Sequence, residues 1–452
     1  MPRKKNIQTT VVIPQERPPE NVPIGTLMAM NYDDFCRYVV NHRAVPTLLD
    51  GCKDSYRRLL WSAILSYREG TLSPAEGLVK AVSRWHPHSV EGLDGTMALF
   101  VHSGVFSGEG AFGGVNIADG ELDPCAALRY LHISLSPVYH EILKDLIKEV
   151  PQVESPGGEM EPKYMPLPLP LSCCLKSDVM GLAAIKTTIP SFTPWSLYDA
   201  YIHDDPNLLK VNSNINIDYA KSTLRDIWEK GKGKITYYYN VTPCKGPDGR
   251  SEGVMFEGDT WKFVPNWNNE KYKKLIEDGK IFQLDLTDIN GPKVFVGKIP
   301  DARGITVNDV IELAKEMYYT TINYEIKVTS DESAKPIPLK KWIDIVYKNY
   351  IDLVVKVNQK KIAACEFAIK VQEAIPIFRD YIVKVNPSAS DAELMDKLNL
   401  TPDIIKALSG KSLMTIRKTP ENEEVLKKLN RNLMELRSFN PIAYTEEIIK
   451  QM

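Results

Sequence analysis

The sequence predicts a multidomain protein of the α+β class, and three observations support that prediction. The chain has 452 residues, which at about 150 residues per domain suggests about three domains. Residues 31–150 carry mainly helical patterns, and residues 200–330 mix strand-like runs with helical segments. Residues 336–452 carry apolar residues at heptad spacing, which indicates long helices and a third architecture.

The composition is that of an ordinary globular protein. Hydrophobic residues make up 43% of the chain and charged residues 25%, which excludes a disordered, collagen-like or disulfide-stapled chain. No apolar run approaches the roughly 18 residues of a membrane helix, and the basic N-terminus lacks the apolar core of a signal peptide. The seven cysteines form no C-x-x-C pair, so we expect reduced thiols in a cytoplasm and neither a zinc nor a redox site.

Charge is distributed unevenly behind a formal net charge of -2. Residues 37–84 hold eight Lys or Arg against four acids, and residues 335–371 hold eight Lys against three acids. Residues 91–123 hold six acids and no Lys or Arg. The near-neutral average argues against a generic polyanion binder, but local basic surfaces of this kind suit phosphate binding. Two solvated helix faces explain the basic segments equally well.

The first 150 residues predict an arm followed by a helical domain. Residues 1–26 are polar and rich in proline, which is typical of a flexible leader. The run 56–67 is a strong helix former with an apolar face, Pro74 suits the first turn of the next helix, and Pro137 opens another. The Gly-rich residues 104–120 predict a turn or a wing. Three helices and a Gly-rich hairpin suit a winged helix-turn-helix, which the periodicity permits without proving.

The C-terminal part is expected to form two long helices around a compact helical region at about 373–419. Two heptad seams flank that region: Val346, Tyr350, Leu353 and Val357 before it, and Leu426, Leu429, Leu433 and Leu436 after it. An antiparallel coiled-coil arm with a globular tip and a plain helical bundle explain the two seams equally well.

Motifs of metal-dependent and hydrolytic enzymes are absent from the sequence. The seven histidines form no H-E-x-x-H string, and neither a G-x-S-x-G string nor a P-loop occurs. No D-x-D pair stands near a Gly-rich strand end as a magnesium site. We therefore expect no metal site in this chain, and any ATP-driven or metal-assisted chemistry has to come from other chains.

Three strings carry candidate site residues. The string 43–58 places Arg43, Lys53, Arg57 and Arg58 around a Pro/Gly turn at the start of a helix. Cations beside the backbone N–H groups of a helix N-terminus suit a phosphate. The second string is Trp85-His86-Pro87-His88, and the third is a Gly-rich run at 108–113 followed by Ala126-Ala-Leu-Arg129-Tyr130.

The pair Arg129-Tyr130 has a chemical interpretation. A tyrosine hydroxyl is a poor nucleophile at neutral pH because its pKa is about 10. A neighbouring guanidinium stabilises both the phenolate and the charge on an attacked phosphate. Taken alone, however, Arg-Tyr is a common dipeptide, and a His-Pro-His string is usually a loop.

In order and spacing, the strings resemble the breakage-reunion subunit of type IIA DNA topoisomerases, the family of the gyrase A subunit. The family string around R-A-x-P-x-x-x-D-G-x-K-P-x-x-R-R matches residues 43–58, and its A-A-x-R-Y matches residues 126–130. Its Y-H-P-H-G-D matches at His86-Pro87-His88 only, and its E-V-P recurs at 149–151. The resemblance is specific over about 31–195 and weak over 200–330. The length, and the end after a returning helix, look most like the medium subunit of T-even-type bacteriophage topoisomerases.

The resemblance implies four parts. An N-terminal arm covers residues 1–30, and a CAP-like winged-helix DNA-gate domain with the catalytic tyrosine covers residues 31–155. An α/β tower or shoulder domain covers residues 156–335. A long antiparallel coiled-coil arm covers residues 336–452, with a helical C-gate tip at about 373–419.

The resemblance also assigns roles to single residues. Tyr130 is the nucleophile that forms a 5′-phosphotyrosyl link with DNA, and Arg129 stabilises the transition state. Leu182 falls where the family places an apolar wedge that bends the duplex. Six further residues fall on DNA-binding positions of the family: Arg43, Lys53, Arg57, Arg58, His86 and His88.

Departures from the family lie in the strings expected to contact DNA and not at Arg129-Tyr130. Trp85 replaces a tyrosine, Ser89-Val90 replaces Gly-Asp, and Tyr56 stands where many relatives have His or Gln. The acidic stretch 91–123 is unexpected beside a DNA gate, and nothing in the sequence explains it.

The family's magnesium-binding TOPRIM domain and its ATPase domain have no counterpart in these residues. The resemblance therefore implies partner subunits that bind Mg²⁺ and ATP, double-stranded DNA as substrate, and a two-fold homodimer of this chain. Without a wrapping domain, the complex is expected to relax and decatenate DNA in the cytoplasm, that of a bacterial host if the chain is phage-encoded. The alternative is a non-catalytic winged-helix DNA-binding or architectural protein. A purely structural helical-arm protein is a third candidate, which the ordered strings disfavour.

Overall fold

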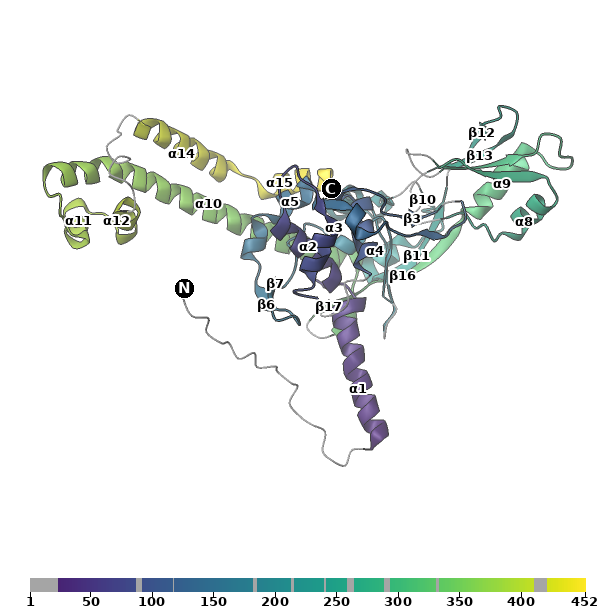
Figure 1. The fold of residues 1–452 in the computed structure, drawn as a ribbon, viewed down its shortest axis with the longest axis horizontal. Helices are drawn as coiled ribbons and strands as arrows, with labels where there is room; N and C mark the ends of the chain where they lie inside the picture. Colours follow the sequence, from purple (N-terminus) through teal and green to yellow (C-terminus); the bar gives the residue numbers. More distant parts are fainter. Residues whose placement is uncertain are drawn as a thin grey trace.

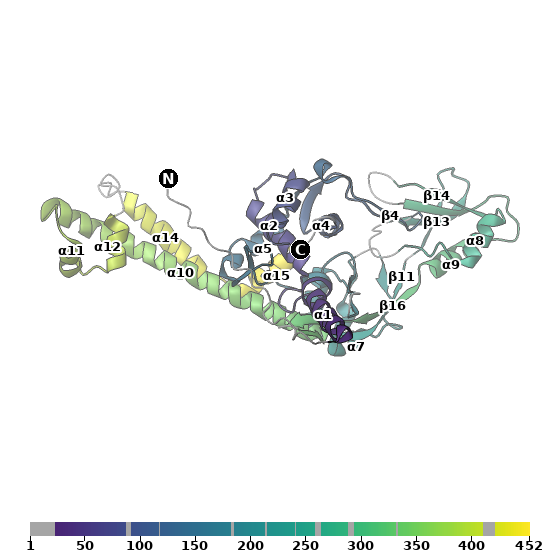
Figure 2. The same ribbon diagram turned by 60° about the horizontal axis from the view of Figure 1, so that its bottom comes forward.

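The computed structural model describes residues 23–86, 92–116, 118–181, 185–212, 215–239, 241–257, 264–287, 293–330, 333–409 and 421–452. Figures 1 and 2 show an elongated α+β molecule in which a central body lies between a long helical arm on one side and a β-rich shoulder on the other. Helix α1 projects from the body by itself. The α+β class predicted from the sequence is the class observed.

Helix α1 (Ile24–Val39) begins directly after Pro23 and continues into the short π-helical segment η1 (Val40–Ala44). The sequence predicted an arm over 1–30, which stays a prediction; its residues 24–30 are helical in the structure. Residues 24–39 hold no proline and one glycine, so nothing breaks the helix after Pro23. Residues 1–22 lie outside the described residues.

The body is built from short helices around a small antiparallel sheet of order β1-β5-β2. Its elements are α2 (Asp54–Ser66), β1 (Ser73–Pro74), α3 (Ala75–Val82), α4 (Leu93–His102), β2 (Phe106–Glu109), β3 (Gly114–Val115), β4 (Leu122–Asp123), η2 (Leu128–Tyr130), β5 (His132–Leu135), α5 (Pro137–Leu143) and η3 (Leu146–Glu149). Leu59, Leu60 and Ala63 of α2 lie in the main core, as the apolar face of the predicted helix requires. Three helices, a sheet and the hairpin β3–β4 are what a winged helix-turn-helix contains, and that assignment stays a prediction.

The shoulder contains two larger antiparallel sheets, of order β10-β11-β16-β9-β8 and β12-β13-β15-β14. The strands of the first are β8 (Val179–Gly181), β9 (Thr187–Ile189), β10 (Asn216–Ile217), β11 (Lys232–Tyr238) and β16 (Thr320–Glu325). Those of the second are β12 (Thr242–Lys245), β13 (Glu252–Glu257), β14 (Ile281–Asp285) and β15 (Lys293–Lys298). The helices are α6 (Pro194–His203), α7 (Leu224–Lys230), α8 (Glu270–Glu277) and α9 (Val307–Met317), with short turns η4 (Leu171–Cys173) and η5 (Pro206–Leu208).

Two separate hairpins attach the shoulder to its neighbours. The hairpin β6 (Gln152–Glu154) and β7 (Met160–Pro162) follows the body, and the hairpin β17 (Lys327–Ser330) and β18 (Ser333–Pro336) precedes the arm. Thr47 of the body pairs with Thr329 of β17 in an isolated parallel bridge, so the start of the arm is tied to the body.

The arm begins with the long helix α10 (Leu339–Lys384), and α14 (Glu421–Ser438) returns along it. Asn358 donates from Nδ2 to the carbonyl oxygen of Leu436 at 2.9 Å, and Arg437 pairs with Glu366 at 2.7 Å. Cys365 lies against the carbonyl of Leu429. From Asn358 to Cys365 along α10, the backbone partner moves back from Leu436 to Leu429 on α14, so the two helices are antiparallel.

The two predicted seams pack differently. Val346, Tyr350 and Leu353 lie in the main core, so the first half of α10 is a helix of the body rather than of a free coiled coil. The four leucines of the second seam are half-buried on an otherwise exposed α14. Helices α11 (Asp391–Leu398) and α12 (Pro402–Ser409) fold against the end of α10 around a second core, and α15 (Pro441–Gln451) returns to the body. The arm and its tip remain predictions as named domains.

Among the described residues, no helix is both long enough and apolar enough to cross a membrane.

Candidate active site

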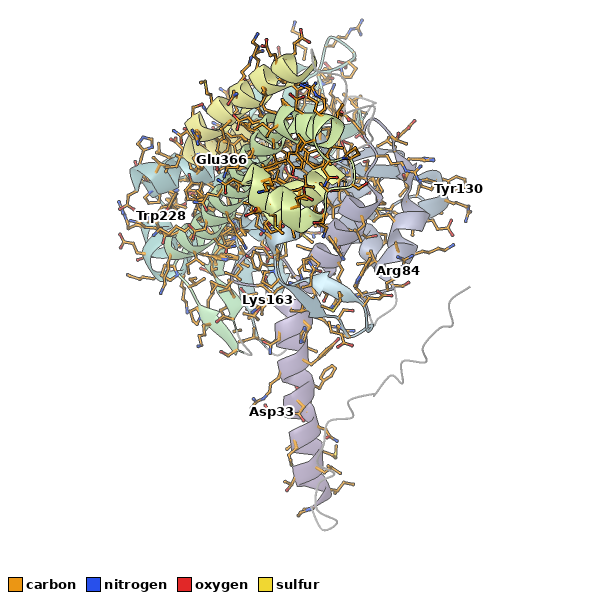
Figure 3. The ribbon with its side chains drawn as sticks, turned by 90° about the vertical axis from the view of Figure 1, so that its left-hand side faces the viewer. Asp33, Arg84, Tyr130, Lys163, Trp228 and Glu366 are labelled. Carbon is orange, nitrogen blue, oxygen red and sulfur yellow. The ribbon has the colours of Figure 1, made fainter. Side chains whose placement is uncertain are left out.

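Tyr130 ends the 3₁₀ turn η2, at the corner where a loop enters strand β5. Ala127 before the turn and Leu131 after it are both extended, so the turn is a sharp corner that turns the tyrosine outward. The Tyr130 side chain is 64% exposed, and Figure 3 shows it at the edge of the body. The guanidinium carbon of Arg129 lies 4.6 Å from the centroid of the Tyr130 ring. A solvent-facing phenol therefore has a cation beside it, which suits attack on an anionic ester.

Backbone contacts hold this corner from two sides. The N–H of Ala75, the first residue of α3, donates to the carbonyl oxygen of Leu131 at 2.9 Å. The N–H of Ala126 donates to the carbonyl oxygen of Ala111 at 2.9 Å. Glu76 on α3 faces the corner: its pKa is lowered by a hydrogen bond from Lys80 and by the charges of Lys80 and Arg129. The corner is thus supported by α3 and by the segment that follows β2.

A basic site lies where the body meets strand β8. Arg43 is exposed in the last turn of η1, and Lys53 donates from Nζ to the carbonyl oxygen of Met180 at 3.0 Å. A side chain at Gly181 would clash with the carbonyl oxygen of Ala44, so the backbones touch there. Lys53 and the backbone next to Arg43 therefore both meet the end of β8. The guanidinium carbon of Arg43 lies 6.0 Å from the centroid of the Tyr38 ring. Burial lowers the pKa of Lys53.

Two predicted site residues cannot be placed. His88 and Leu182 lie outside the described residues. Strand β8 ends one residue before Leu182, so the described part of the chain leads from the Arg43–Lys53 site directly to the position of the predicted wedge.

Arg57 and Arg58 point inward, which differs from the surface contact expected of them. Arg58 binds Glu161 through two hydrogen bonds, Nε to Oε2 at 2.8 Å and Nη2 to Oε1 at 3.0 Å. Its Nη1 lies 3.3 Å from Nδ1 of His86. Arg57 pairs with Asp54, and Nε and Nη1 of Arg57 have no hydrogen-bond partner among the described residues. Contact of either arginine with DNA stays a prediction. In the structure Arg58 joins α2 to β7 and His86, and Arg57 pairs with Asp54 within α2.

The carboxylates of this cluster explain why the arginines turn inward. Asp50, Asp54 and Glu161 are all buried, and none of them is more than 3% exposed. Burial would raise the pKa of Asp54, but a hydrogen bond from His42 and the charges of Arg57 and Arg58 outweigh it and lower that pKa. Asp50 differs, since burial raises its pKa against the charge of Arg57 and the hydrogen bonds from Thr47 and two backbone N–H groups. A buried cation needs an anion, and here the anions are inside.

The acidic half of this cluster was not among the residues predicted from the sequence. Asp54 precedes Arg57 and Arg58 by three and four residues on one helix, a spacing that could have indicated the pairing. Glu161 lies 103 residues from Arg58 in the sequence, and no local signal joins them.

Metal binding by this chain finds no support within the described ranges. No group of three or more His, Cys, Asp or Glu residues that could hold a metal ion occurs there. The expectations of Mg²⁺ and ATP on partner subunits stay predictions.

Comparison with known proteins finds a family match over the part of the chain that contains the candidate site residues. Residues 43–250 match the family of the A subunit of DNA gyrase/topoisomerase IV. The chain is 23% identical to the DNA gyrase A subunit of Brachyspira hyodysenteriae over 95% of this chain and 54% of that protein. It is 23% identical to the DNA gyrase A subunit of Clostridium acetobutylicum over 92% of this chain and 54% of that protein. It is 25% identical to the DNA topoisomerase 4 A subunit of Rickettsia conorii over 53% of this chain and 29% of that protein.

These matches support the conclusion that the chain is similar to the A subunits of type IIA topoisomerases. The matched residues 43–250 contain the Arg43–Lys53 site, the buried cluster and the Tyr130 corner. The chain spans about half the length of the curated gyrase relatives it matches. A special closeness to the bacteriophage proteins stays a prediction.

Proposed function

We propose that this chain is the DNA cleavage and religation subunit of an ATP-dependent type II DNA topoisomerase. The observation that carries the proposal is the Tyr130 corner: an exposed phenol with the Arg129 guanidinium 4.6 Å from its ring, within the region that matches the gyrase and topoisomerase IV A subunits.

In the proposed reaction, the Tyr130 oxygen attacks a phosphorus atom of the DNA backbone. The bond from phosphorus to the 3′ oxygen of the neighbouring nucleotide breaks, which leaves a 5′-phosphotyrosyl link and a free 3′-OH. The phenol loses a proton and the leaving oxygen gains one, so the number of ester bonds is conserved and the reverse step reseals the strand. Arg129 stabilises the negative charge of the transition state. Mg²⁺, bound by a partner chain, supplies further stabilisation of that charge.

We assign the basic site at β8 to the DNA backbone. Lys53 binds the strand that leads to the proposed wedge, Leu182, and the backbone next to Arg43 meets the same strand, which supports the assignment. Arg57 is buried in the structure, and its Nε and Nη1 atoms have no partner among the described residues, so a DNA contact by Arg57 would require its side chain to turn outward. His86 and His88 would complete this surface.

The assembly that we propose contains two copies of this chain and ATPase/TOPRIM subunits that bind ATP and Mg²⁺. A two-fold dimer provides one Tyr130 for each DNA strand. The tip on α10 would close the exit gate after a second duplex has passed. The exposed apolar side chains of α1 support a partner chain on this helix. The complex would relax and decatenate DNA in a bacterial cytoplasm, and net supercoiling of relaxed plasmid would contradict this.

The test uses the chain together with the ATPase/TOPRIM subunits encoded by the same genome, magnesium and plasmid DNA, stopped with detergent. We expect covalent protein–DNA adducts with wild type and none with Tyr130→Phe. Tyr219→Phe, which changes an exposed tyrosine of the shoulder, is the matched control and should retain the adduct. An equal amount of covalent adduct with Tyr130→Phe would refute the assignment of Tyr130 as the nucleophile. DNA binding without adduct in wild type would favour the alternative, a non-catalytic winged-helix DNA-binding or architectural protein.

A further inference from the structure

The acidic hairpin β3–β4 reaches from the body to the shoulder, where the two meet in both views of the fold (Figures 1 and 2). At the turn of the hairpin, Gln283 of strand β14 donates from Nε2 to the carbonyl oxygen of Ala118 at 2.6 Å. The two residues are 165 positions apart in the sequence. A Cβ at Gly120 would lie 3.4 Å from Val264 of the shoulder, so the turn lies close to the shoulder there as well.

The shoulder holds the Gln283 amide in a defined orientation. The hydroxyl of Tyr272 on α8 donates to Oε1 of Gln283, which leaves the Nε2 group directed at the hairpin. Both Gln283 and Ala118 are partly buried, and Ala118 packs against the main core. A half-buried hydrogen bond with a fixed donor is a directional contact, and it specifies one position of the hairpin.

The other end of the same hairpin carries the loop that leads to Tyr130. A side chain at Gly113 would clash with the carbonyl oxygen of Asp123, so the two strands touch closely at the base. Cys125 donates from Sγ to the carbonyl oxygen of Phe112 at 2.9 Å. The N–H of Ala126 donates to the carbonyl oxygen of Ala111, also at 2.9 Å. The loop 124–130 is therefore fastened to the base of the hairpin, residues 111–113.

We infer that Gln283 is a positioning residue: by docking the hairpin β3–β4 on the shoulder, it fixes the start of the loop that presents Tyr130. The inference rests on the proposed function for its catalytic consequence, but the docking contact stands independently of it. The turn that Gln283 contacts is itself held by polar side chains. Asp119 accepts the N–H of Glu121 at 2.8 Å and Asn116 accepts that of Ala118 at 2.8 Å, so polar side chains shape the turn that Gln283 grips.

The test compares Gln283→Leu with wild type in the full chain. Leucine has a similar size but no donor, so the hairpin loses its directional contact. We expect faster amide hydrogen exchange over 111–130, about a 5- to 10-fold slower rate of covalent adduct formation, and an unchanged dissociation constant for DNA. Tyr272→Phe, which frees the Gln283 amide to rotate, should give a smaller effect of the same kind. Gln451→Leu, on an exposed helix face, is the matched control and should change neither quantity.

The outcomes separate the docking contact from the chemistry. Unchanged exchange over 111–130 in Gln283→Leu would overturn the inference. Faster exchange with an unchanged rate of adduct formation would overturn the positioning role, because loosening the hairpin would then have no effect on Tyr130. If wild type forms no adduct, the proposed function fails and the positioning role falls with it, whereas the exchange data still decide whether Gln283 docks the hairpin. Equal thermal melting of all variants shows that none is merely unfolded.

Discussion

At Arg57 and Arg58, two cations lie within reach of three buried carboxylates. The guanidinium of Arg58 meets Glu161 in a two-point contact that also orients His86 through Nη1. A buried ion pair adds little net stability compared with apolar packing, but removal of one partner leaves a charge stranded in a low dielectric. The cluster therefore makes the position of His86, beside the predicted His88, depend on an acid from the hairpin β6–β7.

We expect Glu161→Ala to lower the free energy of unfolding of the body by about 3 kcal/mol, because Arg58 stays buried with its main partner gone. Urea denaturation followed by tryptophan fluorescence measures this. The control is Glu229→Ala, which breaks the solvent-exposed pair with Arg225 on α7 and should cost no more than about 0.5 kcal/mol. Equal losses in the two variants would show that the buried pair has no special weight.

Acid should weaken the same cluster. The pKa of Asp54 is lowered in the folded chain, so its contribution to stability is present above the unfolded pKa, about 3.9, and is lost as the pH falls through the lower folded value. We expect stability to fall more steeply below about pH 4 in wild type than in Asp54→Asn. Denaturation midpoints between about pH 3 and about pH 6 test this, with Asp226→Asn on the surface of α7 as control. Identical slopes in wild type and Asp54→Asn would contradict the pairing.

Among the elements, α1 stands apart because it has almost no packing of its own. An isolated helix of its length is marginal in water, and helices in proteins are stabilised mainly by packing of an apolar face. The apolar residues Ile24, Met28, Tyr32 and Phe35 follow one another at intervals of four, four and three, so they share one side of the helix, and all are exposed. This element is incomplete without something against it.

We expect Met28→Glu to weaken binding of the ATPase/TOPRIM subunits at least about 10-fold, because a charge would be desolvated in an apolar contact. Isothermal titration calorimetry of the two chains measures the affinity. Thr26→Glu carries the same charge on the opposite side of α1 and should leave the affinity within about twofold. If Thr26→Glu weakens binding as much as Met28→Glu, the apolar side of α1 is not the contact.

The arm shows how one helical repeat can serve two environments. Over residues 423–438 of α14 the leucines at heptad spacing are half-buried and the other positions are exposed, which is the pattern of a helix with one packed side. On α10 the same spacing continues into the main core, where neighbours surround the helix. Lys356 and Lys360 both pair with Glu149 of η3, and Lys361 pairs with Asp145, so basic residues of α10 are bound to the body where it leaves the core.

At the scale of the whole molecule, the described chain contains two cores that both include residues of α10, the main core up to Val354 and the tip core from Val371. The body and shoulder share one core, whereas the tip has its own, made by the end of α10 with α11 and α12. Separate cores joined by a helix are expected to open independently. The tip can thus change its packing without disturbing the Tyr130 corner.

We expect Leu408→Ala, which removes a fully buried side chain of the tip, to destabilise α11 and α12 by about 3 kcal/mol and leave the body unchanged. Amide hydrogen exchange measured peptide by peptide distinguishes the two regions. The control is Lys406→Ala on the exposed side of the same helix, with no change expected in either region. Faster exchange in the body of Leu408→Ala would show that the two cores unfold together.

The sequence by itself determined the α+β class, a helix start next to Pro74 and one at Pro137, the seam of α14 and the candidate pair Arg129–Tyr130. These are local properties: periodicity, proline placement and strings of adjacent residues are present in the chain before it folds. The structure differs slightly at the first helix start, because Pro74 is the N-cap and α3 begins at Ala75. Only the tertiary structure decided that Arg57 and Arg58 face inward. The same is true of the hydrogen bonds from Lys53 to β8 and from Gln283 to the acidic hairpin. For Arg58, Lys53 and Gln283 the partner lies more than 100 residues away, at Glu161, Met180 and Ala118, and its identity depends on which segments the cores bring together. The sequence shows where a basic residue stands along a helix. Whether its side chain meets a carboxylate or the solvent depends on how the segments pack.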